Sequence, residues 1–101
     1  MEQYHLIIRQ GVQEFINAAE LLEITGITQN TLDRFLEFGL IEPVDSNTGA
    51  LWFDIGTVPR IRMVQRLRSD VGINLSGIAI ILNLKDQIQQ LQQELDWYRN
   101  Y

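Results

Sequence analysis

The 101-residue sequence has no cysteine, one histidine and two prolines. The absence of cysteine excludes a disulfide framework, thiolate zinc sites and a thiol nucleophile. A single histidine, His5, excludes multi-histidine metal sites and disfavours a histidine-based catalytic triad. The longest apolar run, Ile78–Leu82, is far shorter than the roughly 18 residues that a membrane-spanning helix needs.

The sequence also lacks the patterns of an enzyme or of an exported protein. It contains no nucleophile–base set, no phosphate-cradling glycine loop and no metal-ligand spacing. Its first residues, Met1–His5, lack the basic flank and apolar segment of a signal peptide. We therefore expect a small, soluble, cytoplasmic domain that is not an enzyme and needs no cofactor and no metal.

Basic residues are scarce in the first half of the chain. The formal net charge is −5, but residues 1–56 carry two arginines against nine acids, a net −7. Residues 57–101 carry six basic side chains against four acids, a net +2. A DNA-binding domain normally presents a basic surface, so this balance disfavours nucleic acid as the partner.

Two short helices are predicted in succession. Asn17 can cap the first, with Glu20 at the capping-box position, and Gly26 ends it. Thr28 can cap the second, which runs through 31–38 and stops at Gly39. Two helices joined by a Gly-Ile-Thr turn have a helix-turn-helix outline.

A β-hairpin is predicted after these helices. Leu40–Val44 and Ala50–Phe53 flank a turn at Asp45–Gly49 whose residues all favour turns. This hairpin, at about residues 40–53, has the place of the wing in a winged helix. A further short strand is predicted at Tyr4–Arg9.

The remaining chain predicts two more helices. Asp54 or Thr57 can cap the first of these, and we favour Thr57 because Pro59 then falls in the first turn of the helix. Its apolar face is predicted to consist of Ile61, Val64, Leu67 and Val71. Gly72 ends that helix, and Asn74 caps a long last one that runs to about Trp97.

The last helix carries a heptad seam. Apolar and aromatic residues recur with alternating spacings of three and four. They are Ile81, Leu84, Ile88, Leu91, Leu95 and Tyr98. We interpret the seam as a homodimerisation surface; the alternative is that the helix packs on its own domain. The expected organisation is a winged helix-turn-helix domain at 1–73 and a dimerisation helix at 74–101.

Several of these segments resemble a known family. The stretches Phe38–Pro43, Trp52–Asp54 and Gly77–Ala79 are similar to those of MerR-type winged-helix regulators, and within them to the chaperone-modulator branch of CbpM-like proteins. The resemblance implies a mainly α, MerR-like winged helix-turn-helix fold. It also implies that the chain binds the J-domain of a DnaJ-like co-chaperone and inhibits or regulates its work with a DnaK-type chaperone.

The sequence departs from the DNA-binding members of that family. Two residues of their recognition helix, an arginine and a tyrosine, touch phosphates, and these positions are Asp33 and Arg34 here. The phosphate-contacting arginine of their wing falls at about Leu51. An acid facing a phosphate repels it. The alternative of a DNA-binding transcriptional regulator would rest on five arginines. They are Arg34, Arg60, Arg62, Arg66 and Arg68.

The candidate partner-binding residues are acids and one aromatic from the helix-turn-helix and the wing. They are Asp33, Glu37, Glu42, Trp52 and Asp54. The alternative for the acids is an ordinary solvated helix face. Trp52 and Phe53 are adjacent in a strand and point to opposite sides, so one of them is expected in the core. Arg66 and Arg68 are expected to pair with acids of the front half.

Overall fold

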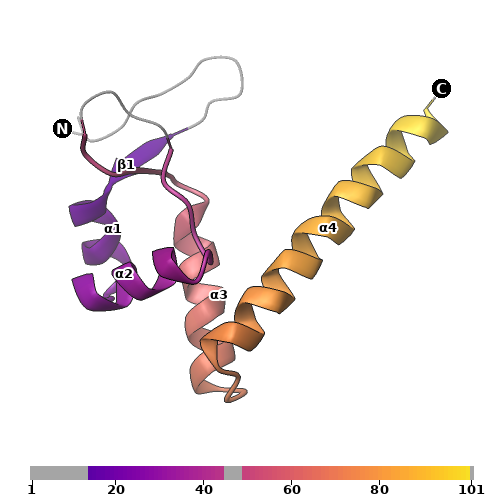
Figure 1. Ribbon diagram of the computed structural model, residues 1–101. Coiled ribbons are helices and arrows are strands. Elements are labelled where there is room, and N and C mark those ends of the chain that lie inside the picture. Colours follow the sequence, from indigo (N-terminus) through magenta and orange to yellow (C-terminus); the bar gives the residue numbers. More distant parts are fainter. Residues whose placement is uncertain (1–13, 45–48, 101) are drawn as a thin grey trace.

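The computed structural model describes residues 14–44 and 49–100, which form a mainly helical fold with a long C-terminal helix (Figure 1). In chain order the elements are β1 (Phe15–Asn17), α1 (Ala18–Thr25), α2 (Gln29–Glu37), β2 (Trp52–Asp54), α3 (Thr57–Ser69) and α4 (Leu75–Arg99). The strand predicted at 4–9 and most of the turn predicted at 45–49 lie outside the described residues. Within the described ranges, none of the helices combines the length and hydropathy that crossing a membrane requires.

The start and end of α1 confirm the predicted capping pattern. The Glu20 backbone N–H donates to Asn17 Oδ1 at 2.9 Å, and the Asn17 N–H donates to Glu20 Oε1 at 3.1 Å. This capping box satisfies two donors that the first turn of a helix leaves unpaired. Gly26 ends the helix with φ of 78°, a left-handed conformation that glycine adopts without steric cost.

Helix α2 follows after a tight turn, as predicted. Thr28 Oγ1 accepts from the Thr31 backbone N–H at 3.1 Å and caps the helix. The helix begins at Gln29 and ends at Glu37, and the chain then turns at Gly39 with φ of 72°. Helices α1 and α2 therefore form the expected helix-turn-helix.

The two-stranded sheet includes a partner that the sequence did not predict. Strand β2 pairs antiparallel with β1, with Ile16 opposite Phe53. Among the described residues, the two arms of the predicted wing form an antiparallel bridge in which the Val44 N–H donates to the Trp52 carbonyl at 2.8 Å. This bridge supports the predicted hairpin at the end of the wing that the structure describes.

Helix α3 corrects two predictions. Its cap is Gly56, which has no side chain to donate or accept, and Thr57 is the first helical residue rather than the cap. Pro59 is then the third helical residue, where its missing N–H costs nothing because first-turn donors have no partner within the helix. The helix ends at Ser69, so Val71 lies beyond it and is 64% exposed instead of on the buried face.

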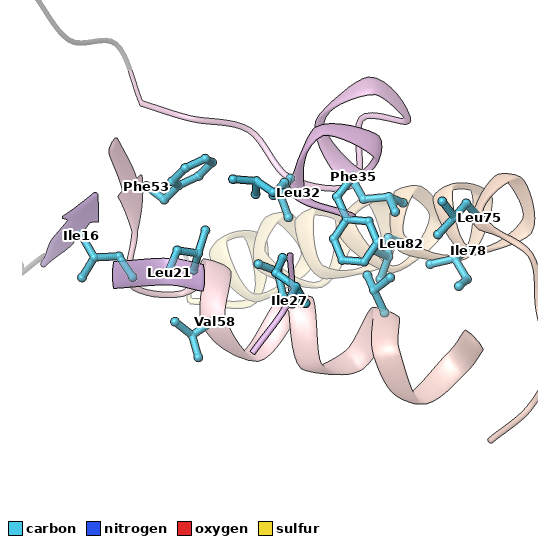
Figure 2. Packing of buried hydrophobic residues seen from close by; sticks show 14 residues of the cluster. Ile16, Leu21, Ile27, Leu32, Phe35, Phe53, Val58, Leu75, Ile78 and Leu82 are labelled. Carbon is cyan, nitrogen blue, oxygen red and sulfur yellow. The ribbon is translucent and has the colours of Figure 1, made fainter. Parts of the chain in front are cut away.

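The core lies among the two strands and all four helices (Figure 2). Its largest fully buried side chains come from every described element. They are Phe35, Phe53, Ile16, Leu21, Leu32, Leu40, Ile61, Ile78, Leu82 and Val64. Each helix thus places one apolar face against the same cluster, as the helical spacing in the sequence predicts.

Helix α4 joins the core only through its beginning. Leu75, Ile78 and Leu82 are buried against the body, whereas every residue from 83 to 100 is exposed. Figure 1 shows the rest of the helix projecting away from the other elements. The six residues of the heptad seam are 37–69% exposed, so they do not pack on their own domain.

Candidate protein-interaction site

Two of the predicted partner-binding acids lie on α2. Asp33 and Glu37 are four residues apart, so they share one face of the helix, and both are exposed. Gln29 Nε2 donates to Asp33 Oδ1 at 2.9 Å, which leaves the carboxylate charge facing solvent. This exposed face of the second helix of the helix-turn-helix is therefore acidic.

The two aromatic residues of β2 lie on opposite sides of the strand. Phe53 is completely buried opposite Ile16, while Trp52 is half-buried on the other side of the strand. Asp54, the next residue, points with Trp52 and is also half-buried. The expectation that one of the two aromatics belongs to the core is confirmed, and Trp52 is the one left near the surface.

A groove of about 640 Å³ brings together further acids from three segments. Its walls are the segment that follows α2, the end of β2 with the start of α3, and the first half of α4. Glu42 and Asp54 of the predicted set line it, together with Asp86 of α4. The predicted residues Asp33, Glu37 and Trp52 lie outside it.

Sequence reasoning missed Asp86. In the sequence it is one polar residue among many in the heptad helix. The signal that could have found it is its spacing of four from Leu82, the last buried residue of α4, because residues four apart share a helix face. That spacing directs Asp86 back toward the body rather than along the seam.

Arg60 of α3 contacts two other walls of this groove. Its Nε–H donates to the carbonyl of Leu40, and its two terminal nitrogens donate to Asp86 Oδ1 and Oδ2, each at 3.2 Å. The fork geometry suits a carboxylate, but exposed pairs of this kind contribute only about 0–1 kcal/mol. The contact therefore orients α4 on the body more than it stabilises the fold.

The pairing expected for Arg66 and Arg68 was wrong. Among residues 14–44 and 49–100, neither arginine forms an ion pair with an acid of the front half. Both lie exposed near the end of α3, past the turn in which Arg60 reaches Leu40 and Asp86.

Thr57 contributes an unusual group to the same groove. The residue is 8% exposed and lines the groove, and its hydroxyl has no hydrogen bond to any part of the chain that the structure describes. Beside it, the Gly56 N–H donates to Asp54 Oδ2 at 3.3 Å and holds that carboxylate at the start of α3. A buried hydroxyl without a partner is uncommon and costs about 1–3 kcal/mol.

This observation leads to a stability prediction. Replacing Thr57 by valine removes the hydroxyl and keeps a β-branched side chain of similar size. We expect the free energy of unfolding to stay the same or to rise by up to about 1 kcal/mol, since no hydrogen bond is lost. Urea denaturation of both proteins measures this, and a loss of more than about 1 kcal/mol would mean that the hydroxyl has a partner in the folded chain.

The described residues of the surface that would meet DNA do not form a basic stripe. Asp33 and Arg34 are both exposed on α2, and Leu51, which is 40% exposed, precedes β2. Arg60 is bound to Asp86 in the groove, and Arg62 donates to the Ile24 carbonyl at 3.4 Å. Arg60 and Arg62 thus contact different parts of the body.

The order of elements defines a class of protein. A helix-turn-helix, a wing segment after it and a long C-terminal helix form the winged helix-turn-helix of the MerR type. Residues 16–100 match the family described as "MerR HTH family regulatory protein", and the chain belongs to that family.

Individual relatives indicate which branch of the family this chain resembles. The chain is 30% identical, over 70 residues covering 69% of each protein, to the chaperone modulatory protein CbpM of Citrobacter koseri. It is 29% identical, with the same coverage, to the chaperone modulatory protein CbpM of Salmonella arizonae. It is also 31% identical over 70 residues to the putative heat shock protein HspR of Streptomyces coelicolor, covering 46% of that protein. These likenesses support the CbpM-like branch that the sequence motifs had indicated.

Proposed function

We propose that this chain is a protein-interaction modulator that binds the J-domain of a DnaJ-like co-chaperone and regulates its work with a DnaK-type chaperone. The observation that carries the proposal is the acidic, exposed face of α2, with Asp33 and Glu37, in a fold whose DNA-binding members are basic there. The likeness to proteins named as chaperone modulators supports the same class of partner.

Charge explains why such a partner suits this surface. J-domains present a basic helix surface to their chaperone partner, and an acidic competitor is complementary to it. Opposite charges speed the encounter and set the orientation of the two proteins more than they raise the final affinity. The deficit of basic residues in the front half of the chain extends this attraction beyond the contact itself.

We further propose that the chain acts as a homodimer joined along α4. The seam Ile81–Tyr98 is exposed over its whole length, and a shallow apolar hollow of about 470 Å³ lies over its first half. Trp97 and Tyr98 pack edge to face, with ring centroids 5.1 Å apart, at the far end of the helix. Pairing two such helices removes these side chains from water, which is the favourable contribution to a coiled coil.

The partner proposal predicts salt-sensitive binding. We expect calorimetric titration of a J-domain into the chain to give a complex at low salt whose affinity falls steadily as salt is added. The physical reason is that the Debye length shrinks from about 10 Å at 0.1 M to about 3 Å at 1 M and screens exposed charges. Absence of any binding at low salt would contradict the proposal.

A DNA-binding regulator is the second candidate, because the MerR-type helix-turn-helix is intact and Arg34 is exposed on α2. The proposal of a protein partner predicts that a random duplex pool is not shifted on a gel at low salt. A shifted pool would favour the DNA-binding regulator, since non-specific affinity for DNA depends mainly on basic contacts to phosphates.

A further inference from the structure

The groove between α2, α3 and α4 contains a polar group that its own chain does not satisfy. Thr57 is more than nine-tenths buried, lines the groove, and makes no side-chain hydrogen bond within the described residues. Native proteins pair nearly all buried polar groups, and exceptions often mark places where a ligand supplies the partner. The hydroxyl is therefore a candidate contact for a group that enters from outside.

The charges around this hydroxyl favour a cation. Glu42, Asp54 and Asp86 line the groove against a single cationic side chain, Arg60. Both terminal nitrogens of Arg60 are already bonded to Asp86, so its charge is largely compensated there. The carboxylates of Glu42 and Asp54 remain without a cationic partner in the described chain.

The end of α2 adds to the same preference. Phe38 and Gly39, which follow the last turn of this helix, also line the groove. The carbonyls of Arg34, Phe35 and Leu36 already accept from the N–H groups of the next residues, but this end of the helix still carries the negative end of its dipole. The carboxylates and the α2 dipole thus both favour a cation in the groove.

The placement of these groups on separate segments favours an organic cation over a metal ion. No group of three or more acidic, histidine or cysteine side chains in the described residues is close enough to hold a metal. Acceptors that stand apart on separate segments suit a guanidinium, whose five N–H groups point in fixed, different directions. An ammonium group, by contrast, acts as a compact point charge.

We propose that this groove receives an arginine side chain of the protein partner, with Glu42 and Asp54 as its carboxylate acceptors and the Thr57 hydroxyl as a third acceptor. The inference rests on the proposed function for the identity of the partner, but the chemistry of the groove can be tested without it. It adds a specific contact in a pocket to the contact that the α2 face makes with the same partner.

The first test uses a small probe with a matched neutral analogue. N-acetyl-arginine amide is titrated into the full ¹⁵N-labelled chain, and N-acetyl-citrulline amide, which keeps the shape but has no charge, is the control. We expect saturable amide shifts at Gly39, Gly56 and Thr57 with the arginine compound, and at least tenfold weaker binding of the citrulline compound. Equal shifts with both compounds, or none with either, would overturn the proposal.

Variants of the chain sharpen this test. We expect Glu42→Gln combined with Asp54→Asn to lower the affinity for the arginine probe at least tenfold. We expect Thr57→Val to lower it about threefold. The control is Asp33→Asn with Glu37→Gln, which removes the same charge outside the groove and should change the affinity less than twofold. If the control weakened probe binding as much as the groove variant does, the proposal would be overturned, because binding would then depend only on the net charge of the chain.

A further variant moves the Asp54 carboxylate without changing the net charge, and so tests whether its position matters. A Cβ at Gly56 would lie 2.9 Å from Asp54 Oδ2, so Gly56→Ala must push that carboxylate aside. The φ of −61° at this residue suits alanine, so the backbone need not change. We expect weaker probe binding with an unchanged fold, as judged by the remaining amide shifts; unchanged affinity would count against the assigned role of Asp54.

The same variants distinguish this inference from the proposed function. If a J-domain binds the wild-type chain and the Glu42→Gln, Asp54→Asn variant equally well, the groove proposal is wrong and the function stands. If the arginine probe binds in the groove but no J-domain binds, the groove proposal stands and the identity of the partner is wrong. Weaker J-domain binding by the groove variant, with Glu23→Gln, Asp70→Asn as the charge-matched control, supports both.

Discussion

Replacing Phe53 by alanine is expected to lower the free energy of unfolding by about 3–5 kcal/mol. The ring is completely buried, and its strand pairs through it with Ile16 of β1. Its removal costs both the transfer of the side chain from water and the cavity that remains. Small domains have only about 5–15 kcal/mol of total stability, so the variant should unfold at much lower urea concentrations.

The matched control for this prediction is Leu51→Ala. Leu51 lies two positions earlier in the same segment but is 40% exposed, so its truncation removes far less buried surface. We expect a loss below about 1 kcal/mol for this variant. Comparable losses for the two variants would contradict the placement of Phe53 in the core.

The second large effect concerns the heptad seam. Leu91→Asp combined with Leu95→Asp is expected to convert a dimer of 11.7 kDa chains into a monomer, as measured by light scattering. Both leucines lie in the exposed part of α4, remote from the core, so the body should remain folded. The reason for dissociation is that two carboxylates from each chain would be forced into the dimer seam without partners.

A charge-matched variant controls for the added negative charge. Gln89→Asp combined with Gln93→Asp introduces the same two carboxylates outside the seam on the same helix. We expect this variant to keep the mass of the wild-type chain. Equal masses for the wild-type chain and the Leu91→Asp, Leu95→Asp variant would show that the seam does not mediate self-association.

The sequence predicted those features that depend on neighbouring residues. The capping box of Asn17 and Glu20, the cap at Thr28 and the turn at Gly26 each involve side chains and backbone groups within four residues. Such interactions are decided locally, so their pattern can be read directly. The mainly α fold with a helix-turn-helix followed from them and from the apolar spacing.

Features that join distant segments could not be predicted in the same way. The strand Trp52–Asp54 pairs with Phe15–Asn17, a distant partner that the sequence did not indicate in addition to the neighbour across the turn. Thr57 was expected to cap α3, but the helix begins there and buries its hydroxyl. In both cases tertiary packing decided between local alternatives that the sequence leaves nearly equal.

The candidate site was predicted only in part for the same reason. Acidic residues as such are visible in the sequence, and Glu42 and Asp54 were identified by their position in the helix-turn-helix and wing. That they share a groove with Asp86 depends on how α4 docks through Leu82 and on the contacts of Arg60. No short-range pattern specifies such a junction of three segments.

The central claim is that acidic side chains on a MerR-type scaffold bind a basic J-domain surface. Its most direct test is a low-salt titration of one J-domain into three proteins: the wild-type chain, Asp33→Asn with Glu37→Gln, and the control Glu23→Gln with Asp70→Asn. We predict binding to the wild-type chain and the control, and about tenfold weaker binding to the α2 variant. No binding to the wild-type chain, or equal binding to all three proteins, would contradict the claim.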